Sequence, residues 1–523
     1  MFEPRPDVHA PLMAHKRETE RKYEAPSARD SSWLPDLSGV GGVESVLDQG
    51  TDELDAVYYD TDDLRIARAS ATLRRRTGGA DAGWHLKLPL SGDSREEVQA
   101  PLSDTLPDTL RELVLSRTRG ADVRPVVRVR STRRTRHLVD PEGDILAELS
   151  VDAVRADPLP SGDTSASWTE MEIELAEDSD PALLDTLDKT LRANSIARAD
   201  HPSKLARALE ETGAGTQPGP DTSARTDEPG SAGEEILRYL AEQVSALVEL
   251  DPSVRRDLPD AVHKMRVTCR RLRSVLRSYR PVLAREVTDP IRAELKWLGA
   301  ELGAERDQEV LRERLGSHIR TSPTELVLGP VEARLRVWDV ARTADARQRT
   351  LDALRSPRYL ALLDSVATLV QRPPLRRRAD RAPEKVMAKA ILKEYERLAA
   401  RVAHAMEVPP GTERDTALHQ ARKAAKRTRY ATEPARSALG KPAKRFGKRV
   451  KAVQKVLGEH QDSVVARDAL HQLAVAAQTA GEAGFTWGLL YGQERALAEQ
   501  RERELPAVWA EASKSGTRKA LAH

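Results

Sequence analysis

The stretch Glu18-Thr-Glu20-Arg-Lys22 near the N-terminus decides the fold of the first half of the chain. Side chains at every second position of a β-strand point the same way, so both glutamates and the lysine share one face. The same alternation returns in Glu170-Met-Glu172-Ile-Glu174. The first half of the chain therefore begins and ends with a predicted strand that has one charged face.

Between and around these stretches run short, nearly alternating segments bounded by Gly, Asp and Pro. Helices are expected only as a minor part, around 107–115 and 181–194. Seven or eight antiparallel strands with few helices predict a closed or nearly closed barrel, an α+β domain. The strand-like segments are residues 19–25, 56–61, 71–77, 83–90, 125–139, 144–154 and 168–176.

Charged side chains of both signs recur on one face of several strands. Such a face is ordinarily the outside of a sheet, but a water-filled barrel interior explains it equally well. Carboxylates converging inside a barrel would repel one another unless a hard divalent cation lay among them, and oxygen ligands favour Mg²⁺ or Mn²⁺. Cations facing such a metal would suit hydrolysis of phosphoanhydride bonds, since Arg and Lys bind phosphate oxygens. The candidate cations are Arg74, Arg76, Lys87, Arg128, Arg130 and Lys204.

The two halves of the chain differ in charge. Residues 1–210 carry 28 Lys and Arg against 40 Asp and Glu, whereas the remainder carries 56 against 42. Residues 212–234 are rich in Gly, Pro, Ser and Thr, which indicates a flexible linker. Beyond it, Ala, Leu, Arg, Glu and Lys recur at helical spacing, so all-helical bundles are expected. A basic half suits a polyanionic partner, although charge alone equally fits a half that merely keeps itself soluble.

The helical half repeats itself. The stretch from His263 to Arg273 corresponds to the stretch from His419 to Arg429 at an offset of 156, and Leu302–Asp307 corresponds to Leu457–Asp462 at an offset of 155. Two landmarks in the same order at nearly one offset indicate a duplicated helical unit, related by a pseudo-two-fold axis.

Each copy carries a basic stripe along one helix face, because its cations recur at spacings of three and four residues. A row of cations repels itself unless an anion neutralises it, whereas a merely solvated face would mix in Asp and Glu. Nucleic acid is the rival ligand, but 4% aromatic content and the lack of RNA-binding or zinc signatures favour a partner with phosphates and no bases. The stripes are His263, Arg266, Arg270 and Arg273, continued by Arg277, and His419, Arg422, Lys426 and Arg429.

Several classes of protein are disfavoured by the sequence. Residues 1–18 lack the apolar core of a signal peptide, and no run approaches the length of a membrane-spanning helix, so a cytoplasmic protein without a membrane partner is expected. Cys269 is the single cysteine, which rules out an internal disulfide. The oligomeric state is left open.

Six signatures occur in one order along the first half: Glu18-x-Glu20-x-Lys22, Tyr58-Tyr-Asp-Thr61, Leu73-Arg74-x-Arg76, Asp152, Glu170-x-Glu172 and Ser203-Lys204. With them, residues from about 15 to 210 resemble a CYTH domain of the triphosphate tunnel metalloenzymes. The resemblance implies an eight-stranded tunnel and metal-dependent cleavage of triphosphates.

The same resemblance implies residue roles. Its principal metal ligands would be Glu170 and Glu172, helped by Glu18, Glu20 and Asp152, with Mg²⁺ or Mn²⁺ as the metal. The catalytic set would be Glu18, Glu20, Lys22, Glu170 and Glu172. Phosphates would be bound by Lys22, Arg74, Arg76, Lys87, Lys204 and one of Arg128 or Arg130.

The second half, from about 234 to 509, resembles a CHAD domain, the conserved-histidine helical domain, through its two His-led basic helices and the paired Leu-Gly motifs. This implies two four-helix bundles whose basic helices bind inorganic polyphosphate. The predicted domains are 12–210 and 234–515, joined by a linker at 211–233. We therefore expect an inorganic triphosphatase with a polyphosphate-binding domain. The alternatives are a non-catalytic polyphosphate-binding protein targeted to polyphosphate granules, and an adenylate cyclase.

Overall fold

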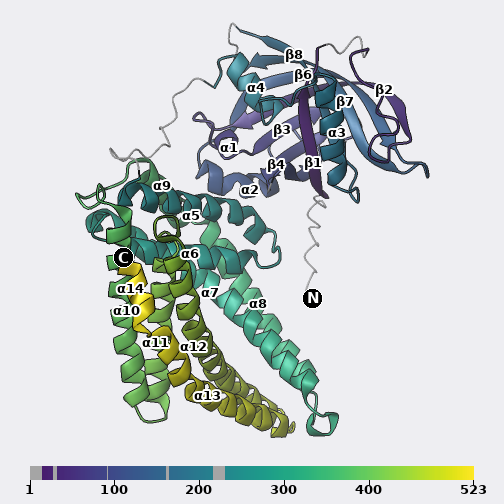
Figure 1. Ribbon diagram of the computed structural model, residues 1–523. Coiled ribbons are helices and arrows are strands. Elements are labelled where there is room, and N and C mark those ends of the chain that lie inside the picture. Colours follow the sequence, from purple (N-terminus) through teal and green to yellow (C-terminus); the bar gives the residue numbers. More distant parts are fainter. Residues whose placement is uncertain (1–13, 27–31, 91, 161–163, 216–229, 523) are drawn as a thin grey trace. The chain divides into compact units, whose positions relative to one another are not determined.

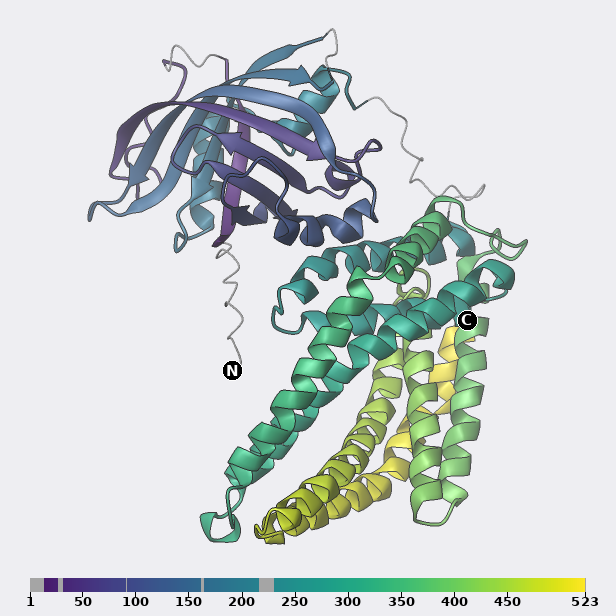
Figure 2. The ribbon, with the colours of Figure 1, turned by 180° about the vertical axis from the view of Figure 1, so that it is seen from behind.

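The computed structural model describes residues 14–26, 32–90, 92–160, 164–215 and 230–522 (Figures 1 and 2). The chain divides into two compact units, residues 1–219 and 220–523. Residues 216–229, which make up most of the predicted linker, lie outside the described residues, as do residues 1–13 with the start of the predicted first domain.

The first unit contains a closed barrel, in which the described residues form eight antiparallel strands in the order β1-β5-β4-β3-β2-β6-β7-β8. The predicted antiparallel barrel is therefore confirmed. The strands are β1 (Ala14–Glu24), β2 (Ser45–Asp60), β3 (Thr72–Thr77), β4 (Gly83–Pro89), β5 (Ser94–Ala100), β6 (Arg124–Val139), β7 (Ile145–Pro158) and β8 (Ala166–Leu175). The helices are α1 (Arg65–Arg68), α2 (Asp108–Thr118), α3 (Ala182–Ala193) and α4 (Lys204–Glu211).

Helices cover the outside of this barrel, so its apolar strand faces point outwards (Figure 1). Leucines of α3, including Leu187 and Leu191, pack with Leu149 and Ile173 of β7 and β8. Leucines of α2 pack in the same way on the outer side chains of β3, β4 and β5. Each such leucine gains about 1.5–3 kcal/mol from burial. Because alternate residues face opposite ways, the charged faces point inwards, which decides between the two interpretations of the charged faces.

Helix α4 closes over apolar side chains at one end of the barrel. Leu205 and Leu209 cluster with Tyr58, Val127 and Trp168 of β2, β6 and β8. The helix begins at a Ser hydroxyl, residue 203, that accepts the backbone N–H of residue 206, a standard N-cap. The cap and the apolar contacts fix where the first residue of α4 enters the barrel.

The second unit is helical throughout its described residues apart from short connections, with two copies of one helical pattern, as predicted. The long α7 and α8 are neighbours in the first copy, as are α12 and α13 in the second (Figure 2). The first copy comprises α5 (Ala232–Arg255), α6 (Ala261–Ser278), α7 (Arg285–Thr321), α8 (Val331–Arg355) and α9 (Pro357–Gln371). The second comprises α10 (Pro383–Glu407), α11 (Thr412–Ala431), α12 (Arg436–Thr479), α13 (Phe485–Ala512) and α14 (Ser515–Ala522).

The boundaries of the two copies follow the offset seen in the sequence. Helix α12 is broken at Gly440, whose φ of 53° lies in the left-handed region that glycine tolerates. Its regular part therefore begins at Lys441, which corresponds to the start of α7 at Arg285. Both copies share one large apolar core, to which α5, α6, α10 and α11 all contribute.

Candidate functional site

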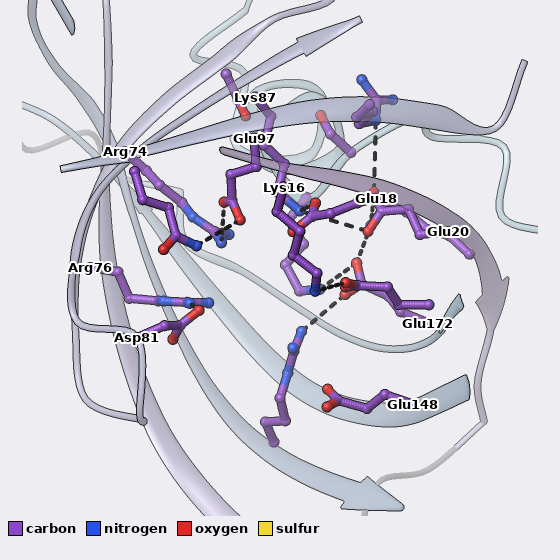
Figure 3. A pocket seen from close by; sticks show the side chains of 18 of the residues that line it. Lys16, Glu18, Glu20, Arg74, Arg76, Asp81, Lys87, Glu97, Glu148 and Glu172 are labelled. Atoms are coloured by element: carbon purple, nitrogen blue, oxygen red, sulfur yellow. Dashed lines mark hydrogen bonds and ion pairs between the residues drawn. The ribbon is translucent and has the colours of Figure 1, made fainter. Parts of the chain in front are cut away.

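The barrel encloses a cavity lined almost entirely by charged and polar side chains (Figure 3). Every strand contributes at least one lining residue, and α4 adds its first residue. The lining acids are Glu18, Glu20, Asp81, Glu97, Glu148, Glu172 and Glu174. The lining bases are Lys16, Lys22, Arg74, Arg76, Lys87, Arg95, Arg133 and Lys204. The predicted acidic and basic residues of β1, β3 and β4 therefore face the same cavity.

One group of carboxylates surrounds Lys204 at the start of α4. The Lys204 Nζ lies 2.9 Å from Asp152 Oδ2, 2.6 Å from Glu170 Oε1 and 2.7 Å from Glu172 Oε1. The three carboxylates have oxygens within 4.8 Å of one another, and all are buried. Trp168 donates its indole N–H to Glu170 Oε2 at 2.6 Å, which orients that carboxylate. This group unites three of the five predicted metal ligands.

A second group lies on β1 and β8. Glu18, Glu20 and Glu174 have oxygens within 4.8 Å of one another. Lys87 Nζ lies 2.5 Å from Glu18 Oε2 and 3.8 Å from Glu20 Oε2. Lys22 joins the two groups, because its ammonium pairs with Glu172 and lies 3.3 Å from Glu20 Oε1. The predicted ligands thus form two adjacent groups rather than one, with Glu174 as an additional member.

The prediction that Arg128 or Arg130 faces the phosphates is wrong. Both are half-exposed on the outside of β6, where Arg128 pairs with Asp55 and Arg130 lies 2.5 Å from Asp157. Arg133 faces inwards instead, because odd-numbered residues of β6 point into the barrel. Its Nη2 donates to Asp152 Oδ2 at 2.8 Å and to Glu172 Oε2 at 2.9 Å.

The strand β5, which the sequence patterns do not predict, carries a site residue. Glu97 is buried and lies directly opposite Lys87 in the register of β4 and β5. Its Oε1 lies 2.9 Å from His85 Nδ1 and 3.8 Å from Arg74 Nη2. The alternation Arg95-Glu-Glu97-Val-Gln99 was the available signal, because all three odd-numbered residues line the cavity.

The charges in the cavity nearly compensate one another. Burial would raise the pKa of Glu20, but Lys22 and Lys87 lower it to about 2. Burial likewise opposes ionisation of Glu172, yet Lys204 and Lys22 hold its pKa well below the usual range. Glu18 differs, since burial, with Glu97 nearby, raises its pKa to about 7 despite Lys87. Glu20 and Glu172 are therefore ionised at neutral pH, whereas Glu18 changes its charge close to it.

Two arginines of β3, Arg74 and Arg76, also line the cavity. Arg74 Nη1 lies 3.5 Å from the Tyr58 hydroxyl, and Arg76 pairs with Asp81 of the turn between β3 and β4. Burial and the charges of Arg74 and Arg133 lower the pKa of Arg76 to about 9. This crowding of positive charge marks Arg76 as a group that an additional anion would stabilise.

In the helical unit, the basic stripes of α6 and α11 approach each other. Burial lowers the pKa of Lys426 to about 7, with further lowering from Arg422 on its own helix and from Arg270 and Arg266 on α6. Burial and Arg266 also lower the pKa of Arg270. Four predicted cations, two from each copy, therefore converge and repel one another.

The paired Leu-Gly motifs hold one arginine in each stripe. Arg266 Nη1 donates to Asp307 Oδ1 at 2.6 Å, and Arg422 Nη2 donates to Asp462 Oδ1 at 3.3 Å. The glycine of each motif lies under the guanidinium: a Cβ at Gly303 would come within 3.1 Å of Arg266 Nη2. The aspartates thus orient the arginines, and the glycine leaves room for one of them.

The remaining predicted stripe residues lie beside this four-cation cluster. Burial and the neighbouring Arg306 lower the pKa of His263. Burial and the charge of Lys423 lower the pKa of His419 in the same way. Arg273 has Arg292 and Arg277 as its charged neighbours, and Arg429 lies 4.5 Å from the centre of the Tyr430 ring. The structure therefore brings together Arg266, Arg270, Arg422 and Lys426 most closely.

These two sites define the class of protein: a triphosphate tunnel joined to a conserved-histidine helical domain. Residues 16–209 match the CYTH domain, and residues 238–471 match the CHAD domain. An uncharacterized protein of Mycobacterium tuberculosis, Rv2226, is 39% identical over 518 residues, which cover 96% of this chain and 97% of the relative. The chain belongs to the family of CYTH–CHAD proteins.

Two solved structures are similar to parts of the chain. PptA from Streptomyces chartreusis is 22% identical with a TM-score of 0.46, covering 54% of this chain and 99% of its own. The CHAD domain of the plant Ricinus communis is 25% identical with a TM-score of 0.43, covering 57% of this chain and 97% of its own.

Family membership gives the coarse function. CYTH proteins handle triphosphates or other phosphoryl groups with the help of metal ions, and CHAD domains are associated with polyphosphate. Within the described residues, no helix is both long and apolar enough to cross a membrane.

Proposed function

We propose that this protein is a metal-dependent inorganic triphosphatase whose second domain binds polyphosphate. The hydrolysis is assigned to residues 12–210 and the binding to residues 234–515. The observation that carries the proposal is the cavity of the barrel, whose lining combines carboxylates, among them Glu18, Glu20 and Glu172, with a series of lysines and arginines. Such a lining suits a ligand that is itself a chain of anions accompanied by a divalent cation.

The carboxylate groups fit a hard metal ion. Their donors are oxygens alone, and three of them surround an ammonium, that of Lys204, at 2.6–2.9 Å. A position that already holds one cation between three carboxylates is suited to Mg²⁺ or Mn²⁺. The metal would be held by Glu18, Glu20, Asp152, Glu170 and Glu172, and it would polarise a phosphoryl oxygen or the attacking water.

The other residues of the tunnel bind and orient the phosphate chain. Lys22, Lys87, Lys204 and Arg133 supply positive charge next to the carboxylates, where they offset the charge of the transferred phosphoryl group. Arg74 and Arg76 continue the series along β3 and can grip phosphate oxygens with two N–H groups each. The apolar side chains under α4 limit water at that end of the barrel.

The activity is tested by phosphate release from tripolyphosphate with Mg²⁺ or Mn²⁺, for the full chain and for Glu170→Gln and Glu172→Gln. Each variant is expected to lower kcat by about a hundredfold or more, a usual cost of removing a group that holds charge at the reacting centre. Glu177→Gln, an exposed acid just after β8, serves as the matched control. Wild-type-like rates in both tunnel variants would contradict the proposal.

The binding role is tested separately. Reversing the charge of Arg266, Arg270, Arg422 and Lys426 should abolish polyphosphate binding by the second domain and association with polyphosphate granules, while tripolyphosphate turnover persists. A chain that binds polyphosphate but turns over no triphosphate would be the non-catalytic alternative. Formation of cyclic AMP from ATP would indicate a cyclase instead.

A further inference from the structure

A carboxylate on the turn between β3 and β4 reaches back into the tunnel. Asp81 pairs with Arg76, and both side chains line the cavity (Figure 3). Arg76 is buried, with 6% of its side chain exposed, whereas Asp81 is 47% exposed at the cavity's edge. The acid is thus part of the cavity lining but can swing towards solvent.

The turn that carries this acid is held in place by its backbone. Gly78 and Gly79 have φ values of 82° and 70°, and a Cβ at Gly78 would come within 2.1 Å of the Glu53 carbonyl oxygen. Only glycine suits that position. The turn therefore has a defined path next to β2.

A buried histidine ties the same turn to the interior. His85 Nε2 lies 2.9 Å from the Asp81 carbonyl oxygen, and its Nδ1 lies 2.9 Å from Glu97 Oε1. His85 is 1% exposed, so these contacts are buried within the barrel. The position of Asp81 is thereby coupled to a carboxylate deep in the phosphate site.

Along β3, Arg76 is well separated from the carboxylates of Glu18 and Glu20 on β1. Lys87, which pairs with Glu18, is opposite Thr72 in the register of β3 and β4. Arg76 is four residues further along β3, a rise of about 13 Å. A phosphate chain that starts beside Glu18 and Lys87 would therefore reach Arg76 only with its far end.

We propose that Asp81 limits the length of phosphate chain that the tunnel accepts, by occupying Arg76 in place of a distal phosphoryl group. A chain that extends to Arg76 must displace the carboxylate and is repelled by it, whereas a shorter chain does not meet it. An ion pair with one half-exposed partner contributes little to stability, so displacement affects affinity without blocking binding. This inference rests on the proposed triphosphatase function.

The test compares Asp81→Asn with wild type in the full chain, using tripolyphosphate, tetrapolyphosphate and medium-chain polyphosphate. Asp81→Asn keeps the shape of the side chain and removes its charge. We expect kcat/KM for the longer chains to rise about tenfold relative to tripolyphosphate, as one lost charge repulsion in a partly buried site allows. For the longer chains, Asp81→Asn should lower KM and leave kcat unchanged.

Asp104→Asn is the matched control. Asp104 lies 3.5 Å from Arg75, the neighbour of Arg76 that points outwards, and is fully exposed. Asp104→Asn should leave the ratio of kcat/KM between longer chains and tripolyphosphate unchanged. An equal change for all lengths in Asp81→Asn, or a rise in KM, would show that the acid only positions Arg76 and would overturn the inference.

Failure of the triphosphatase itself would look different. Wild-type protein would then release no phosphate from any chain, so the comparison moves to calorimetric binding of tripolyphosphate and tetrapolyphosphate in EDTA. Tighter binding of tetrapolyphosphate alone by Asp81→Asn would still support the inference, and unchanged binding of both would overturn it.

Discussion

Lys426 should make polyphosphate binding depend on pH in a range where lysines normally do not titrate. Burial and the charges of Arg422, Arg270 and Arg266 lower its pKa to about 7 from an ordinary value of 10.5, with Asp462 opposing the shift. A bound polyanion favours the charged form, so the ammonium regains its proton on binding. Affinity should then fall as the pH rises through 7.

The magnitude follows from linkage. Each pH unit above the pKa of the free protein weakens binding by up to tenfold, so the loss between pH 7 and pH 9 reaches about a hundredfold. Lys426→Arg should keep a positive charge throughout this range, because a guanidinium loses its proton at a much higher pH than an ammonium in the same place. The variant should bind at pH 9 nearly as tightly as at pH 7.

The assay is fluorescence anisotropy of labelled polyphosphate at constant ionic strength, with EDTA present. Constant salt matters because phosphate binding releases counterions. The histidines of both stripes are shared by the two proteins, so the difference between them isolates Lys426. Parallel pH curves for wild type and Lys426→Arg would refute the reasoning.

The same shift has the opposite sign for folding without ligand. A lysine whose pKa is lower in the folded state than in the unfolded state destabilises the fold fully below about pH 7, and this cost disappears as the pH rises towards 10.5. Polyphosphate should therefore raise Tm most at low pH, where the ammonium is charged and the neighbouring arginines repel it.

Two further substitutions have matched controls within the chain. Arg133→Lys should lower kcat/KM for tripolyphosphate by about tenfold, because lysine lacks the forked donors that reach two carboxylates, whereas Arg130→Lys on the outer surface should change it less than about twofold; equal losses would contradict the inward placement. Gly303→Ala should weaken polyphosphate binding by about fivefold, since its Cβ would crowd Arg266 at 3.1 Å and shift a charge-assisted contact. Gly458→Ala, where the nearest guanidinium atom is 3.7 Å away, should bind normally in the same anisotropy assay.

The strand and helix patterns in the sequence predict most of the fold. Alternation of charged and apolar residues predicted seven of the eight strands, and the offset of 155–156 residues predicted the duplication. The strand β5 escaped because Ser94–Ala100 contains only Val98 and Ala100 as apolar residues. A strand with a charged inner face and neighbours that supply its outer packing needs few apolar side chains, so composition alone does not reveal it.

The choice among the arginines of β6 failed for a different physical reason. On β1, β3 and β8 the inward face is the charged one, and the same rule applied to β6 selects Arg128 and Arg130. On β6 the inward face begins with Val127, which packs with α4 at the end of the barrel. Arg133 is therefore the first charged residue of β6 that points into the barrel. The reason is the packing of α4, a helix more than sixty residues further along the sequence.

The two domains differ in how their buried cations are balanced: those of the barrel are paired with carboxylates, whereas those of the helices repel one another. The barrel pairs its cations with its own carboxylates, as Lys204 does with Glu170 and Glu172, so a metal–phosphate complex must exchange with existing ion pairs. Exchange costs affinity but positions every group before the reaction, which favours catalysis. The helices instead leave Arg270 and Lys426 repelling each other, so an incoming polyanion relieves strain directly. Relief of repulsion favours tight, salt-dependent binding without selection of one phosphate, as the proposed binding of long polyphosphate by this domain requires.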